Sequence, residues 1–165
     1  MPQPSREVVF AALNTLLLAA NWTAVFPNGL QNTDSRVMKP WEMVDSAIQP
    51  ALYLQEGPQK VEQNTPGGAF GLNRWTWTAK VWVYFRRDAI NAIPATIVNQ
   101  VVDTIDQAIL PPGLPGRQQT LASQNSGKAL VTNVRITEVM FDEGMLDPKS
   151  GQVVVMIGLE ILTSN

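Results

Sequence analysis

The stretch LNRWTWTAKVWVYFR, residues 72–86, constrains the fold more than any other part of the chain. Every odd-numbered position from 75 to 85 is apolar, whereas the even-numbered positions are polar until Trp82 and Tyr84. An alternation of period two over this length predicts one long β-strand with a core face and a more polar face. At about 3.3 Å per residue the strand would be roughly 40 Å long, more than a domain of this size needs for its own core. We therefore predict that part of it serves contacts beyond the domain.

Two helices are predicted on either side of this strand. Residues 5–20 repeat apolar side chains at helical spacing, with Ser5 as the N-cap and Glu7 in the first turn. A second apolar stripe at the same spacing starts at Pro94, which suits the first turn of a helix. The sequence PPGLPG at 111–116 ends this second helix.

Three further strands complete the predicted sheet. The first covers residues 51–56, and the third covers 130–141 with a bulge near Thr137 and Glu138, because its apolar positions change phase there. The last, 153–162, is almost entirely apolar, as expected of a strand covered on both faces. The order α-β-β-α-β-β predicts one α+β domain over residues 1–165, with a four-stranded, mostly antiparallel sheet and both helices packed on it.

Two of the connecting segments are long for a domain of this size. Residues 27–45 contain the turn signal Pro27-Asn28-Gly29 and are predicted as an extended arm, with a short helical turn at 41–45. Residues 57–73 contain several glycines and prolines and are predicted as a long hairpin loop, into which the strand stems can extend. Loops of more than about a dozen residues are usually functional or disordered.

The composition excludes several classes of chemistry. The chain has no cysteine and no histidine, so it has no disulfide, thiol nucleophile, zinc finger, Ser-His-Asp triad or imidazole metal ligand. Its net charge of -2 argues against a dedicated nucleic-acid binder, which normally carries a clustered basic excess. We predict no catalytic residue, no cofactor and no metal.

Carboxylates leave one enzymatic alternative open. Asp103 and Asp106 lie close together on the second helix, and Asp142, Glu143 and Asp147 cluster in the last hairpin. Paired carboxylates could serve a small hydrolase, and the hairpin cluster could hold a hard cation. We prefer a solvated helix face and an acidic turn, since the hairpin lacks the spacing of a calcium loop.

Two other motifs have simpler interpretations. The sequence GGAFG at 67–71 lacks the spacing and the Lys-Ser/Thr of a phosphate-binding loop, so we interpret it as a flexible loop. Arg74, Lys80 and Arg86 accompany Trp82 and Tyr84 on a strand face where bases could stack. Without an RNP-like motif, we interpret that face as mixed core and interface.

The apolar run at 8–20 is too short to cross a bilayer, which takes about 20 apolar residues. Asn14 interrupts it, and Glu7 stands where a secretory leader would be positive. We predict no membrane partner and, by default, a cytoplasmic location.

Several segments, taken in order, resemble one family. RVMKPWEMVDSAIQPALYLQEG at 36–57, WTWTAKVWVYFR at 75–86, AIPATIVNQVVDTIDQAI at 92–109 and VRITEVMFDEGML at 134–146 precede a last apolar strand. This series is similar to that of the tail terminator, or tail-completion, proteins of long-tailed bacteriophages. The resemblance covers residues 6–162 and rests on the order of the segments rather than on any single motif.

The resemblance implies a small α+β subunit that assembles into a ring, usually a hexamer. The ring would cap the finished tail tube, end its polymerisation and present a surface to the head-side neck or connector protein. DNA would pass through the lumen without specific binding. The protein would be made in the host cytoplasm and would become part of the virion. The close alternatives are another neck or head–tail joining protein, or a tail tube subunit with the same fold.

A head-to-tail ring needs two different patches on each subunit. The arm at 33–41, the loop at 57–73 and the aromatic strand are the predicted sources of these patches. The candidate interface residues are Arg36, Lys39, Trp41, Phe70, Arg74, Trp82, Tyr84 and Arg86. Trp22 and Trp41 lie in predicted loops, where a tryptophan is more often a cover over the core than a binding anchor.

Overall fold

The computed structural model describes residues 4–32, 35–36, 48–63, 73–86, 94–110, 120–142 and 151–164. Within them the elements are α1 (Arg6–Leu18), β1 (Ala51–Gln63), β2 (Asn73–Arg86), α2 (Pro94–Ile109), β3 (Asn133–Asp142) and β4 (Gln152–Ser164). Two short 3-10 turns, η1 (Trp22–Ala24) and η5 (Ala122–Gln124), lie in the connections. The chain is an α+β fold, and the predicted order of helices and strands is confirmed.

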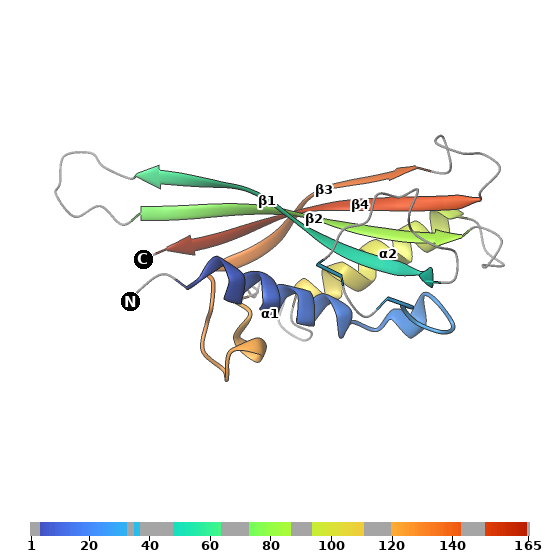
Figure 1. The fold of residues 1–165 in the computed structure, drawn as a ribbon, viewed down its shortest axis with the longest axis horizontal. Helices are drawn as coiled ribbons and strands as arrows, with labels where there is room; N and C mark the ends of the chain where they lie inside the picture. The colour runs from blue at the N-terminus through green and yellow to red at the C-terminus, as the bar shows by residue number, and fades with distance from the viewer. Residues whose placement is uncertain are drawn as a thin grey trace.

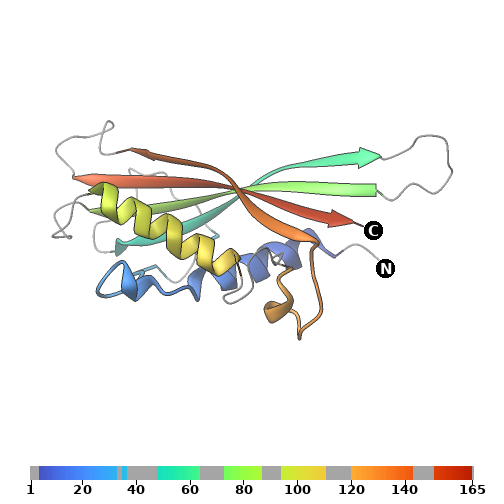
Figure 2. The same cartoon turned by 180° about the vertical axis from the view of Figure 1, so that it is seen from behind.

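The four strands form one antiparallel sheet in the order β1-β2-β4-β3. The long aromatic strand β2 is central and pairs with β1 on one side and β4 on the other, while β1 and β3 are the edges. The sheet is strongly twisted, and both helices lie on the same side of it (Figure 1). The view from behind shows α2 running beneath one half of the sheet and α1 beneath the other (Figure 2).

The core lies between the helices and the face of β2 predicted to be apolar. Trp77, Val81 and Phe85 are buried on that face, and the ring of Phe10 from α1 stacks on Trp77 at 6.3 Å between centroids. The Trp22 side chain is also buried, and its indole N–H donates to the Leu17 carbonyl at 2.8 Å. That bond satisfies a carbonyl in the last turn of α1, which helps to explain why the helix stops there.

Helix α1 is slightly shorter than the predicted range of 5–20. Ser5 occupies the N-cap position as predicted, but its hydroxyl makes no capping hydrogen bond. By length and composition alone, the segment Arg6–Ala24 could cross a membrane, with a mean hydropathy of 1.3. In this fold the apolar stripe of α1, which includes Val9 and Leu13, is buried against the sheet. Packing in the core therefore accounts for part of the hydropathy of this segment, of which 33% is buried.

Strand β1 continues to Gln63 and does not end at Glu56 as predicted. The register with β2 shifts between Glu56 and Gln59, so Gly57 and Pro58 form a bulge in β1. Glycine and proline are tolerated at a bulge and on an edge strand, where a ladder hydrogen bond can be lost. Strand therefore extends into the predicted loop from the β1 side, and residues 64–72 lie outside the described residues.

Strand β3 carries the predicted bulge but starts later than predicted. Its register with β4 shifts between Ile136 and Glu138. Leu130 and Val131 precede the strand because their backbone N–H groups both donate to the Thr120 carbonyl. The predicted helical turn at 41–45 lies outside the described residues.

Gly57 provides a test of the bulge. A Cβ added there would lie 2.8 Å from the backbone oxygen of Thr78, which cannot move without disturbing β2. We expect Gly57→Ala to lower the free energy of unfolding by about 1–3 kcal/mol, measured by urea denaturation. Gly158→Ala is the matched control, because its Cβ would meet only the side chains of Thr137 and Glu138. Equal losses in the two variants would contradict this account of the bulge.

Candidate interaction surface

The end of β3 is the most apolar exposed surface among the described residues. Val139, Met140 and Phe141 follow one another and are 42%, 58% and 54% exposed. Val139 and Phe141 pair with Ile157 and Val155 of the helix-side core, whereas Met140 lies on the opposite, helix-free face of the sheet. Both faces of this strand end are therefore apolar. Natural edge strands usually carry charges, prolines or a cover, so such an end indicates a contact surface.

The first half of β1, the other edge, is covered within the chain. The backbone N–H of Gln31 donates to the Pro50 carbonyl at 2.7 Å, and that of Leu54 donates to the Ser35 carbonyl at 2.6 Å. The Asn32 side chain bonds both backbone groups of Leu52, at 2.7 and 2.9 Å. These contacts use the outward-facing groups of this half of the strand, so it cannot accept another strand.

The second half of β1 is open. Pro58, Gln59, Lys60 and Val61 are all exposed, and β2 is the only described segment that hydrogen-bonds to them. Val61 alone is 46% exposed. The described part of the chain therefore has two open sheet edges, the second half of β1 and the end of β3. They differ in sequence and belong to the two outermost strands of the sheet.

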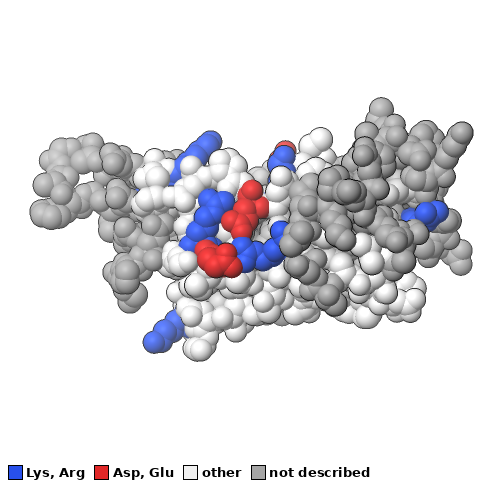
Figure 3. Space-filling view, in the orientation of Figure 1, with Lys and Arg blue, Asp and Glu red and all other residues white. Residues whose placement is uncertain are grey.

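A cluster of four charged side chains joins α1, β1 and Arg36 of the predicted arm. Arg36 donates to Glu7 at 2.5 Å and also pairs with Glu56. Arg6 lies 3.2 Å from the same Glu56 and donates to the Gly57 carbonyl at 2.5 Å. The charges gather near the middle of one face of the molecule (Figure 3). The predicted interface residue Arg36 is thus half-buried and bound within its own chain.

The pKa values of this cluster follow from its hydrogen bonds. The bond from Arg36 lowers the pKa of Glu7 below its ordinary value. The bonds to Glu7 and then Glu56 raise the pKa of the Arg36 guanidinium. Both shifts favour the charged forms. The bonds themselves connect Arg36 to Glu7 on α1 and to Glu56 on β1.

Tyr84, a predicted interface anchor, is not a surface residue in this structure. It is 2% exposed and packs on Tyr53 with its ring at 70° and 5.9 Å between centroids. With Ala51 these two tyrosines form a second apolar cluster on the helix-free face. Burial, and then the neighbouring Tyr53, raise the pKa of Tyr84 to about 12.

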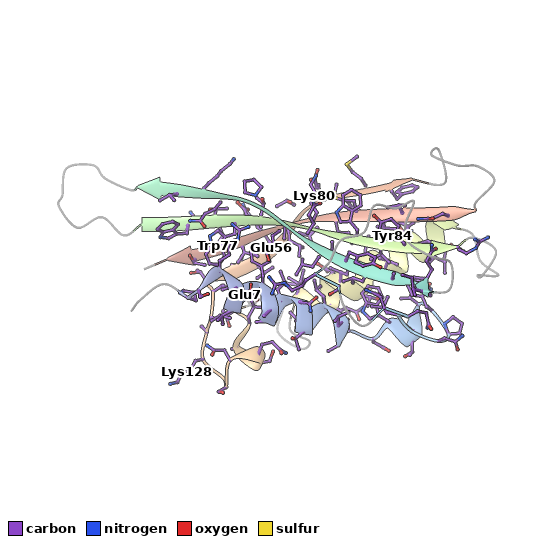
Figure 4. The ribbon with its side chains drawn as sticks, in the orientation of Figure 1. Glu7, Glu56, Trp77, Lys80, Tyr84 and Lys128 are labelled. Atoms are coloured by element: carbon purple, nitrogen blue, oxygen red, sulfur yellow. The ribbon has the colours of Figure 1, made fainter. Side chains whose placement is uncertain are left out.

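The other predicted interface residues are spread along β2 and do not form one patch. Trp82 is half-buried and its indole N–H donates to the Gln55 side chain at 2.9 Å. Arg74 is exposed at the first end of β2, and Arg86 is half-buried at the last. Figure 4 shows Lys80 on the helix-free side of the sheet and Glu56 towards α1. Lys39, Trp41 and Phe70 lie outside the described residues.

The sequence did not identify the exposed end of β3. The change of apolar phase at Val139 and Phe141 predicted the bulge. It could not show that both side chains are exposed to solvent. That outcome depends on β3 being an edge strand, which no local pattern encodes.

The carboxylates of the enzymatic alternative are described only on α2, where Asp103 is exposed and Asp106 half-buried. The described residues contain no group of three or more acidic side chains that could hold a metal ion. A depression of about 380 Å³ lies at the end of α1, and none of the described residues that line it is ionisable. The acidic side chains of the last hairpin lie outside the described residues.

No protein-family model matches the sequence, and a search of curated proteins finds no match.

The burial of Tyr84 predicts a loss of stability in strong alkali. Because its folded-state pKa is raised above the ordinary value of 10, the neutral phenol stabilises the fold below pH 10. This contribution is lost as the pH rises towards about 12. We expect Tyr84→Phe to remove that phase when urea denaturation is repeated across this range. An unchanged profile in Tyr84→Phe would refute the assignment.

The pKa of Glu7 tests the charge cluster. Since its folded-state pKa is lowered, the bond to Arg36 stabilises the fold above the unfolded pKa and is lost as the pH falls through the folded one. We expect Arg36→Gln to raise the Glu7 pKa towards its ordinary value in an NMR titration. Arg6→Gln is the control, because Arg6 pairs with Glu56. An identical Glu7 titration in the wild type and Arg36→Gln would count against the cluster.

Proposed function

We propose that this chain is a structural assembly subunit, a tail terminator that forms a ring on the end of a bacteriophage tail tube. Three observations support the proposal: the order of sequence segments, the α+β fold and the two open sheet edges. The observation that carries it is the exposed apolar end of β3. An apolar edge strand left open in a single subunit calls for a partner.

The two open edges suit a ring better than a two-fold dimer. One edge is the apolar end of β3, and the other is the second half of β1 with Lys60 and Val61. A contact between two different patches is heterologous, and copies joined in this way form a ring when the rotation between neighbours closes. The family resemblance implies a ring of six copies.

The ring would end tube growth by geometry. One side of it matches the last layer of tube subunits, whereas the other side does not match a further tube subunit and instead receives the head-side neck protein. The last residues of β1 and the first residues of β2 extend past the start of α1 at one end of the molecule, whereas the last residues of β3 and the start of β4 lie at the other end (Figure 1). Such an elongated subunit offers separate ends for two different partners.

DNA would pass through the ring without specific binding. The net charge is -2, and on the helix-free face the cation Arg135 is neutralised by Glu160 at 2.5 Å. Strong, salt-dependent binding of duplex DNA by the isolated protein would contradict this part of the proposal.

Uncapped tail tubes provide the direct test. We expect the purified protein to bind the tube end as a single ring and to stop elongation, which electron microscopy of tube ends and tube lengths measures. Phe141→Glu should abolish capping because it places a charge in the apolar contact. Val8→Glu is the matched control, since Val8 is 50% exposed on α1.

Two results would refute the proposed function. Tubes that keep growing in the presence of the folded protein would exclude a terminator. Long polymers formed by the protein alone would indicate a tube subunit instead.

A further inference from the structure

We infer that the chain binds a second copy of itself by pairing the open half of β1 with β3 of the neighbour, shifted so that Lys60 lies opposite Glu138. This inference names the contact within the proposed ring and rests on the proposed function only for its setting. The pairing continues the antiparallel sheet from one copy into the next, because β1 and β3 run in opposite directions across the sheet order.

Charge complementarity fixes the partner residues. Lys60 pairs with Thr76 and Glu138 with Gly158, which places both side chains on the helix-free face. Both are exposed, and neither has a salt bridge among the described residues. Opposite charges that face each other across two strands stabilise the pair, while like charges destabilise it.

The apolar residues match in the same register. With Lys60 opposite Glu138, the exposed Pro58 comes opposite Met140 on the helix-free face. On the helix side Val61 and Val139 become diagonal neighbours on the same face of the joined sheet. Moving the register by two residues would place either Met140 opposite Lys60 or Pro58 opposite Glu138, and both shifts remove the pair of opposite charges.

The pairing is staggered, and closed β-barrels show a stagger of the same size per strand. Within one copy Lys60 pairs with Thr76, Thr76 with Leu162, and Leu162 with Asn133. Lys60 and Asn133 therefore lie level with each other, in one row across the sheet. Glu138 is level with Gly158, four residues from Leu162 on β4 and therefore about 13 Å away. A shift of four residues over four strands is one residue per strand. Eight-stranded barrels with a shear of eight have the same ratio, and their strands tilt by about 36°.

Engineered cysteines test the register directly, because the natural chain has none. The double variant Lys60→Cys/Glu138→Cys should oxidise into a ladder of covalent multimers on a non-reducing gel. The matched control Lys60→Cys/Asn133→Cys would link copies only if they were level, since these two residues share a row of the sheet. We expect little cross-linking from that control.

Charge reversal gives an independent readout. Lys60→Glu or Glu138→Lys alone should raise the concentration for half-assembly roughly tenfold in sedimentation velocity, and the double reversal should restore it. Lys80→Glu, an exposed cation on the central strand, should leave assembly unchanged.

Three outcomes would overturn the inference: a protein that stays monomeric at all concentrations, efficient cross-linking of the level control alone, or covalent dimers from Glu138→Cys alone. The last would show two β3 edges meeting about a two-fold axis. Rings that cross-link as expected but fail to cap tail tubes would refute the proposed function and leave this contact standing.

Discussion

The central position of β2 is the constraint on which the rest of the structure depends. Hydrogen bonds join it to β1 on one side and to β4 on the other along nearly its whole length. Its helix-side face supplies the rings against which the rest of the core packs, with Trp77 6.3 Å from Phe10 and Phe85 5.6 Å from Phe26. Because a strand bonded on both sides has no open edge, the exposed backbone of the sheet is confined to β1 and β3.

The two edge strands differ in which parts are covered and in the side chains that remain exposed. The two edges of the sheet are therefore not alike. The first half of β1 is covered by Gln31, Asn32 and Ser35, and Arg36 beside them is bound to Glu7 and Glu56. The second half of β1 and the end of β3 remain open, one with a lysine beside a valine and the other with a glutamate beside three apolar residues. Open edges of unlike chemistry favour a head-to-tail contact, since neither edge complements itself.

An assembly role agrees with where the polar groups of this chain are used. Arg6, Arg36 and Arg135 are bound to glutamates, and the Trp82 and Trp22 indoles donate to groups of their own chain. These contacts fix the shape of the chain, as the proposed ring requires. Among the described residues, the run of exposed apolar side chains at 139–141 lies on an edge strand, where contact with another protein is expected.

The sequence by itself determined the elements, because periodicity is a local property: alternation identified β2, helical spacing identified α1 and α2, and a change of phase located the bulge in β3. It placed Tyr84 on the polar face of β2 but could not show that Tyr53 would lie against it. It also ended β1 at Glu56, since a glycine and a proline look like a loop until an edge strand is known to accept them. Only the tertiary structure decided which strands are edges and which side chains stay uncovered. Those properties depend on how distant segments pair, and no window of neighbouring residues contains that information.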